Sequence, residues 1–234
     1  MDMAVTAQAD PSSLSIGTTI QTRVLILGGQ GALGRVVAEA FRQQGWDVLR
    51  AGRRQESAAD FRQFDIDDEA LLGVGLAGAD LIVNTVESRR LAPERYILEH
   101  GGLLLNLATV PQSERERLQG AVASPRGTVI FNVGFSGLMA KVAADLVATR
   151  PEAELLVIGC TLTAGGTSGP EGQAFIQRLL RNRPSHTSSQ LDFGLSFGRR
   201  RTQQVDEMGR EGWVSRRVLG DRPLHVHITS RSDG

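Results

Sequence analysis

The stretch RVLILGGQGALGRVVAEAF, residues 23–41, decides the fold. An apolar run is followed by a turn with the spacing GxGxxG at Gly29, Gly31 and Gly34, and then by residues with helical periodicity. Between a strand and a helix, the first glycine allows a tight turn, the second lets the backbone approach a pyrophosphate, and the third lets the helix pack closely on the strand. The turn therefore predicts a dinucleotide-phosphate site, and a glycine turn that binds nothing is the alternative. The predicted site comprises Gly29, Gln30, Gly31, Ala32, Leu33 and Gly34.

Apolar runs and helical segments alternate after this turn. We expect a helix over 31–45 that Gly45 ends, and further helices over 67–78, 91–102 and 113–122. Strands are expected over 23–28, 47–52, 61–66, 79–86, 103–110 and 128–134. Most of these strands are apolar along their length, which is typical of a parallel sheet covered on both faces. The expected fold class is α/β, a Rossmann doubly wound parallel sheet with a second, smaller α+β domain.

The pattern changes near residue 133, where we place a domain boundary. Residues 1–21 are expected to be a flexible leader, 22–132 a nucleotide-binding domain, and 133–234 a small α+β domain for substrate or dimerisation. In the last part we expect helices over 136–151 and 170–184 and strands over 153–165, 193–197, 213–219 and 224–230. Its apolar residues fit either an intersubunit sheet of a homodimer or the domain's own core: Phe193, Leu195, Phe197, Trp213 and Val214.

Composition and charge exclude several classes of function. Lys plus Arg and Asp plus Glu both total 26, so no overall charge attracts nucleic acid or a membrane surface. Cys160 is the only cysteine, which excludes an internal disulfide and a multi-cysteine metal site. The start of the chain lacks the pattern of a signal peptide, and no segment is apolar enough to cross a bilayer. A cytoplasmic protein with a small-molecule substrate is the expectation.

The end of the second expected strand indicates which dinucleotide binds. An acidic residue there would accept a hydrogen bond from a ribose 2′-hydroxyl, but the sequence VLRAGRR places Gly52 at that position, with Arg53 and Arg54 following. Guanidinium groups pair with a 2′-phosphate, which a carboxylate would repel. The sequence therefore favours NADP over NAD, and the alternative is a pair of solvated surface arginines.

Residues at the ends of the other expected strands are weaker candidates for cofactor contacts, because ligands of such sheets lie beyond the carboxyl ends of the strands. We expect Asp65 near the adenine, and Asn84, Thr85 and Val86 near the ribose and pyrophosphate. Ala108 and Thr109 are expected closer to the nicotinamide. Polar residues at strand ends also satisfy turns, which is the alternative for these positions.

The order of several segments resembles the cofactor domain of the saccharopine dehydrogenase-like family. The resemblance covers residues 22–150, through VLILGGQGALGRVVAEAF, AGRR, GLAGADLIVNTV, YILEHGGLLLNLATVP and the passage GFSGLMA at 134–140. It implies an oxidoreductase that uses NADP or NAD on an amine, imine or carbonyl metabolite. Asn106 stands where many relatives carry an aspartate, the proline common after the glycine-phenylalanine pair is missing, and the second domain is short for the family.

The catalytic residues are not identified by the sequence. A Tyr-x-x-x-Lys proton donor, used by short-chain reductases of similar fold, is excluded because the only tyrosine, Tyr96, has no lysine four residues later. We expect Tyr96 to pack on the buried face of its helix and His100 to interact with the end of that helix. Hydride transfer needs mainly correct placement of nicotinamide and substrate, so the missing motif does not exclude a reductase.

Other candidate residues lie in the second part of the chain. His225 and His227 alternate on one strand but lack further metal ligands, while Cys160 fits a buried small residue and His186 a polar loop. The loop 163–172 either covers an active site or binds an anion, or is an ordinary connection. Two functions stay open: an NADP-dependent oxidoreductase, and a non-catalytic NAD(P)-binding regulatory or partner-binding protein.

Overall fold

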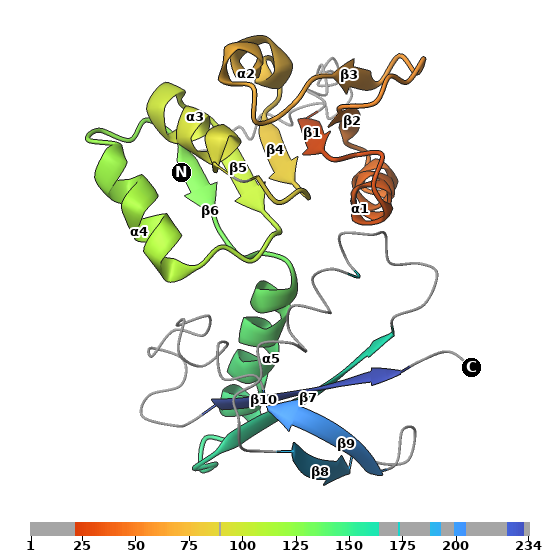
Figure 1. The fold of residues 1–234 in the computed structure, drawn as a ribbon, viewed down its shortest axis with the longest axis vertical. Coiled ribbons are helices and arrows are strands. Elements are labelled where there is room, and N and C mark those ends of the chain that lie inside the picture. The colour runs from red at the N-terminus through yellow and green to blue at the C-terminus, as the bar shows by residue number, and fades with distance from the viewer. Residues whose placement is uncertain are drawn as a thin grey trace, which may run out of the picture.

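The computed structural model describes residues 22–88, 90–163, 173, 188–192, 199–204 and 224–231. Its first sheet has six parallel strands in the order β3-β2-β1-β4-β5-β6 (Figure 1). These strands are β1 (Arg23–Leu27), β2 (Asp47–Gly52), β3 (Phe61–Gln63), β4 (Leu81–Asn84), β5 (Leu103–Asn106) and β6 (Thr128–Ile130). The helices are α1 (Ala32–Gln43), α2 (Glu69–Leu76), α3 (Ala92–His100), α4 (Gln112–Ala121) and α5 (Phe135–Thr149). This is the doubly wound Rossmann fold that the alternating pattern predicts.

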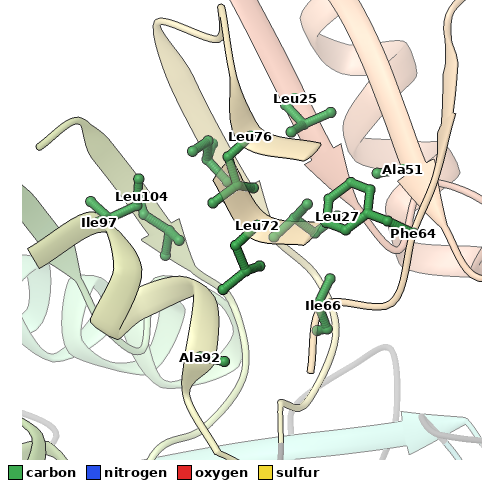
Figure 2. Close-up of a cluster of buried hydrophobic side chains, with 11 residues drawn as sticks. Leu25, Leu27, Ala51, Phe64, Ile66, Leu72, Leu76, Ala92, Ile97 and Leu104 are labelled. Atoms are coloured by element: carbon green, nitrogen blue, oxygen red, sulfur yellow. The ribbon is translucent and has the colours of Figure 1, made fainter. Parts of the chain in front are cut away.

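Alternate residues of β1 belong to two different cores, which explains why the whole strand is apolar. Leu25 and Leu27 pack into a cluster that includes Leu72 and Leu76 of α2 and Ile97 of α3 (Figure 2). On the other face, Val24 and Ile26 pack with Ala38 of α1. Side chains along a strand point alternately to opposite faces, so one strand serves both layers.

The order of strands reverses between β1 and β4, because the chain runs outward from β1 to β3 and then returns to the other side of β1. In open sheets of this kind, ligands bind outside the carboxyl ends of the strands at this switch point. The turn after β1 and the turn after β4 therefore flank the expected crevice.

Several strands are shorter than the sequence predicts, and polar residues account for two of the ends. The predicted strand 103–110 ends at Asn106, whose side chain is bonded to the interior of the domain. The predicted strand 128–134 ends at Ile130, because Asn132 adopts a left-handed φ of 58° and its Oδ1 accepts a hydrogen bond from the backbone N–H of Val110. The predicted glycine stops are confirmed: Gly45, after α1, and Gly101, after α3, have φ of 80° and 103°.

A second sheet has the order β7-β10-β9-β8. Its strands are β7 (Leu156–Thr163), β8 (Ser188–Asp192), β9 (Arg199–Gln204) and β10 (Leu224–Arg231). Strand β10 pairs with β7 in parallel and with β9 antiparallel. The predicted strands 153–165 and 224–230 correspond to β7 and β10, whereas β8 and β9 were not predicted because their sequences, SSQLD and RRRTQQ, are mainly polar.

Several expectations fall outside the described residues. These are the leader 1–21, the helix 170–184 apart from residue 173, the strands 193–197 and 213–219, residues 164–172 of the glycine-rich loop, and His186. The domain boundary near 133 stays a prediction. It lies between β6, the last strand of the first sheet, and α5, which contacts β7.

Candidate nucleotide-binding site

The glycine turn between β1 and α1 is tightly packed, and it needs one more glycine than the motif contains. Gly28, which was not predicted, has the left-handed φ of 77° that makes the turn, a role that the sequence analysis wrongly gave to Gly29. Gly29 is constrained by space instead, since a Cβ atom there would lie 2.6 Å from Cβ of Arg50. A Cβ at Gly34 would lie 2.2 Å from the carbonyl oxygen of Gly28, so the close approach predicted for the third glycine is confirmed.

Only some backbone amides of the turn are available for a ligand. The amides of Gly28 and Gly29 both donate to the carbonyl of Ala51, and the amide of Gly31 donates to the carbonyl of Gly28. The first hydrogen bond into α1 runs from the amide of Arg35 to the carbonyl of Gly31, so the amides of residues 32–34 precede it. Gly31 provides no capping side chain, and the first turn of α1 contains no acidic residue. These three amides, at the positive end of the helix dipole, suit an anion.

Gln30 links the glycine turn to the segment after β2. Its Nε2 donates to the carbonyl of Arg54 at 3.0 Å and to Oε2 of Glu56 at 3.2 Å. The side chains of Arg53 and Arg54 are exposed, and neither forms an ion pair with any residue in the described parts of the chain. The backbone of Arg54 thus lies beside the turn, and both arginine side chains are exposed.

An acidic side chain does reach this turn, although the sequence has no acid at the end of β2 itself. Glu56 comes from four residues beyond Gly52, and it pairs with Arg50 of β2 at 2.5 Å. The same guanidinium binds Asp60 at 2.9 Å, and this hydrogen bond holds the pKa of Asp60 below its usual value. Arg50 thus pairs with both acids, and Arg42 also pairs with Asp60, so two arginines balance the two carboxylates. The sequence did not predict a role for Arg50 or Glu56. The one feature that could have pointed to Glu56 is that it is an acidic residue a few positions after the end of β2.

The turn after β4 packs directly on the glycine turn. A Cβ at Gly28 would lie 2.2 Å from Cγ2 of Val86 and 2.8 Å from Oγ1 of Thr85. Thr85 Oγ1 donates to the carbonyl of Leu27 at 2.7 Å, which ties this turn to the end of β1. Thr85 and Val86 therefore border the glycine turn, as expected for residues at the switch point.

Asn84 has a different position from the one expected of a ligand contact. It is fully buried, and its Oδ1 accepts a hydrogen bond from the backbone N–H of Val86 at 2.9 Å. Its Nδ2 donates to Oε1 of Glu94 at 2.7 Å. The Asn84 side chain therefore supports the turn after β4 from the buried interior of the domain.

Glu94, in the first turn of α3, is the centre of a buried polar cluster that the sequence did not reveal. Nδ2 of Asn106 donates to the same Oε1 atom at 2.5 Å, so the ends of β4 and β5 share one acceptor. Glu94 and Asn106 are both almost completely buried. Burial raises the pKa of Glu94, partly opposed by the hydrogen bonds from the two asparagines.

The other predicted strand-end residues are less informative. Oδ1 of Asp65 accepts a hydrogen bond from the backbone N–H of Asp67 at 3.0 Å, so this carboxylate at least partly serves the turn before α2. Ala108 and Thr109 lie half-buried just after β5. Their predicted contacts with adenine and nicotinamide stay predictions.

The side chains of α3 behave as the sequence indicates. The ring of Tyr96 packs against the core cluster and stacks on His100 with ring centroids 4.2 Å apart. Nδ1 of His100 lies 3.0 Å from the carbonyl oxygen of Tyr96, in the last turn of α3. No group of three His, Cys, Asp or Glu residues suited to a metal ion occurs within the described ranges. No helix in those ranges is long and apolar enough to span a membrane.

Residues 24–116 match the family model of the NAD dependent epimerase/dehydratase family. The match runs from β1 into α4 and covers less than half of the chain. Together with the sheet order and the glycine turn, it defines this part as a Rossmann-type NAD(P)-binding domain. The match does not support the saccharopine dehydrogenase-like family specifically. No curated protein sequence matches the chain.

Solved structures show likeness of fold only. Uronate dehydrogenase from Agrobacterium tumefaciens, in complex with NAD, is 21% identical with a TM-score of 0.33. The match covers 40% of this chain and 45% of the uronate dehydrogenase chain. The chain thus spans less than half of that enzyme. Aspartate semialdehyde dehydrogenase II from Vibrio cholerae is 15% identical with a TM-score of 0.46, covering 91% of this chain and 70% of its own. The Bordetella bronchiseptica enzyme WbmH, in complex with NAD⁺, is 14% identical with a TM-score of 0.34, covering 61% of this chain and 67% of its own.

Proposed function

We propose that the chain is an NADP-dependent oxidoreductase that binds its cofactor across the turns after β1, β2 and β4. The observation that carries this is the glycine turn, where a Cβ at Gly28, Gly29 or Gly34 would collide with neighbouring atoms and the amides of residues 32–34 precede the first hydrogen bond into α1. A pyrophosphate accepts hydrogen bonds from such amides. When bound, the nicotinamide supplies or accepts a hydride, and the protein's task is to orient it against a substrate.

The preference for NADP rests on the charges after β2. Residues 50–60 contain three arginines and two acids; Arg50 pairs with both Glu56 and Asp60, while Arg53 and Arg54 stay exposed, so the segment carries one net positive charge. A 2′-phosphate pairs with guanidinium groups, whereas a 2′-hydroxyl gains little from them. The hydrogen bonds from Gln30 to Arg54 and from Gln63 to Arg53 fix the backbone of both arginines.

The substrate class rests on the sequence resemblance alone, which implies an amine, imine or carbonyl metabolite. The catalytic residue is not assigned. A homodimer formed through the second part of the chain also remains a proposal, as does a cytoplasmic location.

Calorimetric titration with NADPH and NADH tests the cofactor. We expect NADPH to bind at least about tenfold more tightly, which corresponds to about 1.4 kcal/mol. The double variant R53A/R54A should lose this preference, while R117A, an exposed arginine on α4, should keep it. Equal affinities for the two cofactors in the unmodified protein would contradict the role of the arginines.

Turnover is tested separately with NADPH and a panel of imines, oxo acids and aldehydes. Oxidation of NADPH by any of these would support the enzyme. Tight NADPH binding without turnover across the panel would instead favour a non-catalytic nucleotide-responsive protein.

A further inference from the structure

We propose that Glu94 is a positioning residue for the nucleotide crevice: its carboxyl group, bonded to Asn84 and Asn106, fixes the turn after β4 against the glycine turn. The inference rests on the proposed cofactor site, because it assigns Glu94 a role in forming that site. Core packing alone does not require polar side chains at 94 and 106, since apolar side chains would fill the same space, whereas Asn84 also accepts the N–H of Val86.

The chain of contacts from Glu94 to the glycine turn is continuous. Oε1 of Glu94 accepts from Nδ2 of Asn84 at 2.7 Å, and Oδ1 of Asn84 accepts from the N–H of Val86 at 2.9 Å. Val86 and Thr85 occupy the space beside Gly28 that a Cβ would need. The orientation of the Asn84 amide therefore sets the backbone of Val86, and through it one wall of the glycine turn.

Two buried atoms in this cluster lack a partner, and one proton accounts for both. Oε2 of Glu94 and Oδ1 of Asn106 are acceptors without a hydrogen bond. Asn106 already donates to the other carboxyl oxygen at 2.5 Å. A proton on Oε2 directed to Asn106 Oδ1 would complete a cyclic acid–amide pair and satisfy both atoms. Burial, which raises the pKa of Glu94, favours this neutral form.

The described residues of α2, β4, β5 and β6 offer Glu94 no cation, whereas α4, whose Leu118 shares a core cluster with Leu98 of α3, carries Arg115 and Arg117. Helix α3 contacts α2, β5 and β6. Strands β4, β5 and β6 contain no titratable side chain, and the only one on α2, Glu69, pairs with Arg95. Asp67, before α2, adds a further negative charge that raises the pKa of Glu94, and it accepts a hydrogen bond from Ser88. A neutral Glu94 also keeps a negative charge away from the expected pyrophosphate.

The experiment compares three variants by NADPH titration and thermal unfolding. In E94Q, the amide oxygen can accept from both asparagines and its N–H can donate to Asn106, so we expect affinity within about threefold of the unmodified protein. In E94L, which keeps the volume but no polar atom, we expect affinity to fall at least about tenfold. The control is I97A, a buried residue of the same helix outside the polar cluster, which should unfold at lower temperature yet bind NADPH normally when folded.

Three results would overturn the inference. One is normal NADPH affinity in E94L, and another is a loss in E94Q as large as in E94L. The third is an infrared difference spectrum, the unmodified protein minus E94Q, that contains carboxylate bands alone. At neutral pH we expect this spectrum to contain the C=O stretch of a protonated carboxylic acid. This measurement and the NADPH affinity of E94Q decide the matter if E94L does not fold. If the unmodified protein binds no dinucleotide, the proposed function fails instead, and the infrared measurement still reports on the acid–amide pair.

Discussion

Two glycines of the same turn should fail in different ways when replaced by alanine. In G34A, the new Cβ would lie 2.2 Å from the carbonyl oxygen of Gly28, 2.8 Å from its carbon and 2.9 Å from Cα of Gly29. All three are backbone atoms that cannot rotate away. An ordinary contact begins at 3.4 Å, so α1 must move by about 1.2 Å relative to the turn. Overpacking of this kind costs about 1–3 kcal/mol.

G31A should behave differently, because a Cβ there meets only the carbonyl oxygen of Gly28, at 3.2 Å, and the φ of −73° suits alanine. We expect its free energy of unfolding to change by less than about 1 kcal/mol. The methyl group nevertheless fills space where a pyrophosphate would approach the backbone. Binding of NADPH should therefore fall at least about tenfold in both variants, but stability should fall only in G34A.

Differential scanning calorimetry and NADPH titration measure the two effects. For a chain of this length, a cost of about 2 kcal/mol lowers the Tm by about 4–8 °C. G120A is the control, because Gly120 lies on α4 and a Cβ added there would meet nothing within 4 Å, so alanine should be neutral or slightly stabilising. An unchanged Tm in G34A, or normal NADPH affinity in G31A, would refute the reasoning.

Three further predictions concern stability. The hydrogen bond from Arg50 depresses the pKa of Asp60, so the pair stabilises the fold above the ordinary pKa of an aspartate, and this contribution is lost as pH falls through the lower, folded value. The free energy of unfolding of R50Q should therefore fall less than that of the unmodified protein as the pH is lowered. Urea unfolding across the acid range measures this difference. G134A should cost about 1–3 kcal/mol, since a Cβ would lie 2.2 Å from the carbonyl oxygen of Leu107; an unchanged unfolding midpoint would contradict this. Because the pKa of Glu94 is raised, its contribution is present below the ordinary pKa of a glutamate and is lost as pH rises through the folded value; this fall in stability above the ordinary pKa should be smaller in E94Q, and identical pH profiles would argue against it.

The sequence predicts the sheet well because each strand carries its own signal. Val24 to Leu27 are apolar on both faces, which is the pattern of a strand covered by helices on two sides. The glycine stops after α1 and α3 were recognisable for a similar local reason, since left-handed φ values favour glycine. Strands β8 and β9 lacked any such apolar pattern.

The site was predicted less completely, because the sequence does not reveal which way a side chain points. Asn84 was expected at the crevice and is buried beneath it, and Glu94 reads as an ordinary acid in the first turn of a helix. Glu56 reaches Gln30 only because the chain folds back after β2. Gly28 was missed because the spacing GxGxxG begins one residue later, whereas its left-handed φ and the atoms of Val86 and Thr85 beside it are features of the folded turn.

The central claim is that the amides at the start of α1 bind the pyrophosphate of a dinucleotide. An amide-resolved NMR titration of isotope-labelled protein with NADP tests it most directly. We expect saturable shifts of the amide signals of Ala32, Leu33 and Gly34, with the signal of Gly120 unchanged. Shifts that spare residues 32–34, or no shifts at millimolar NADP, would contradict it.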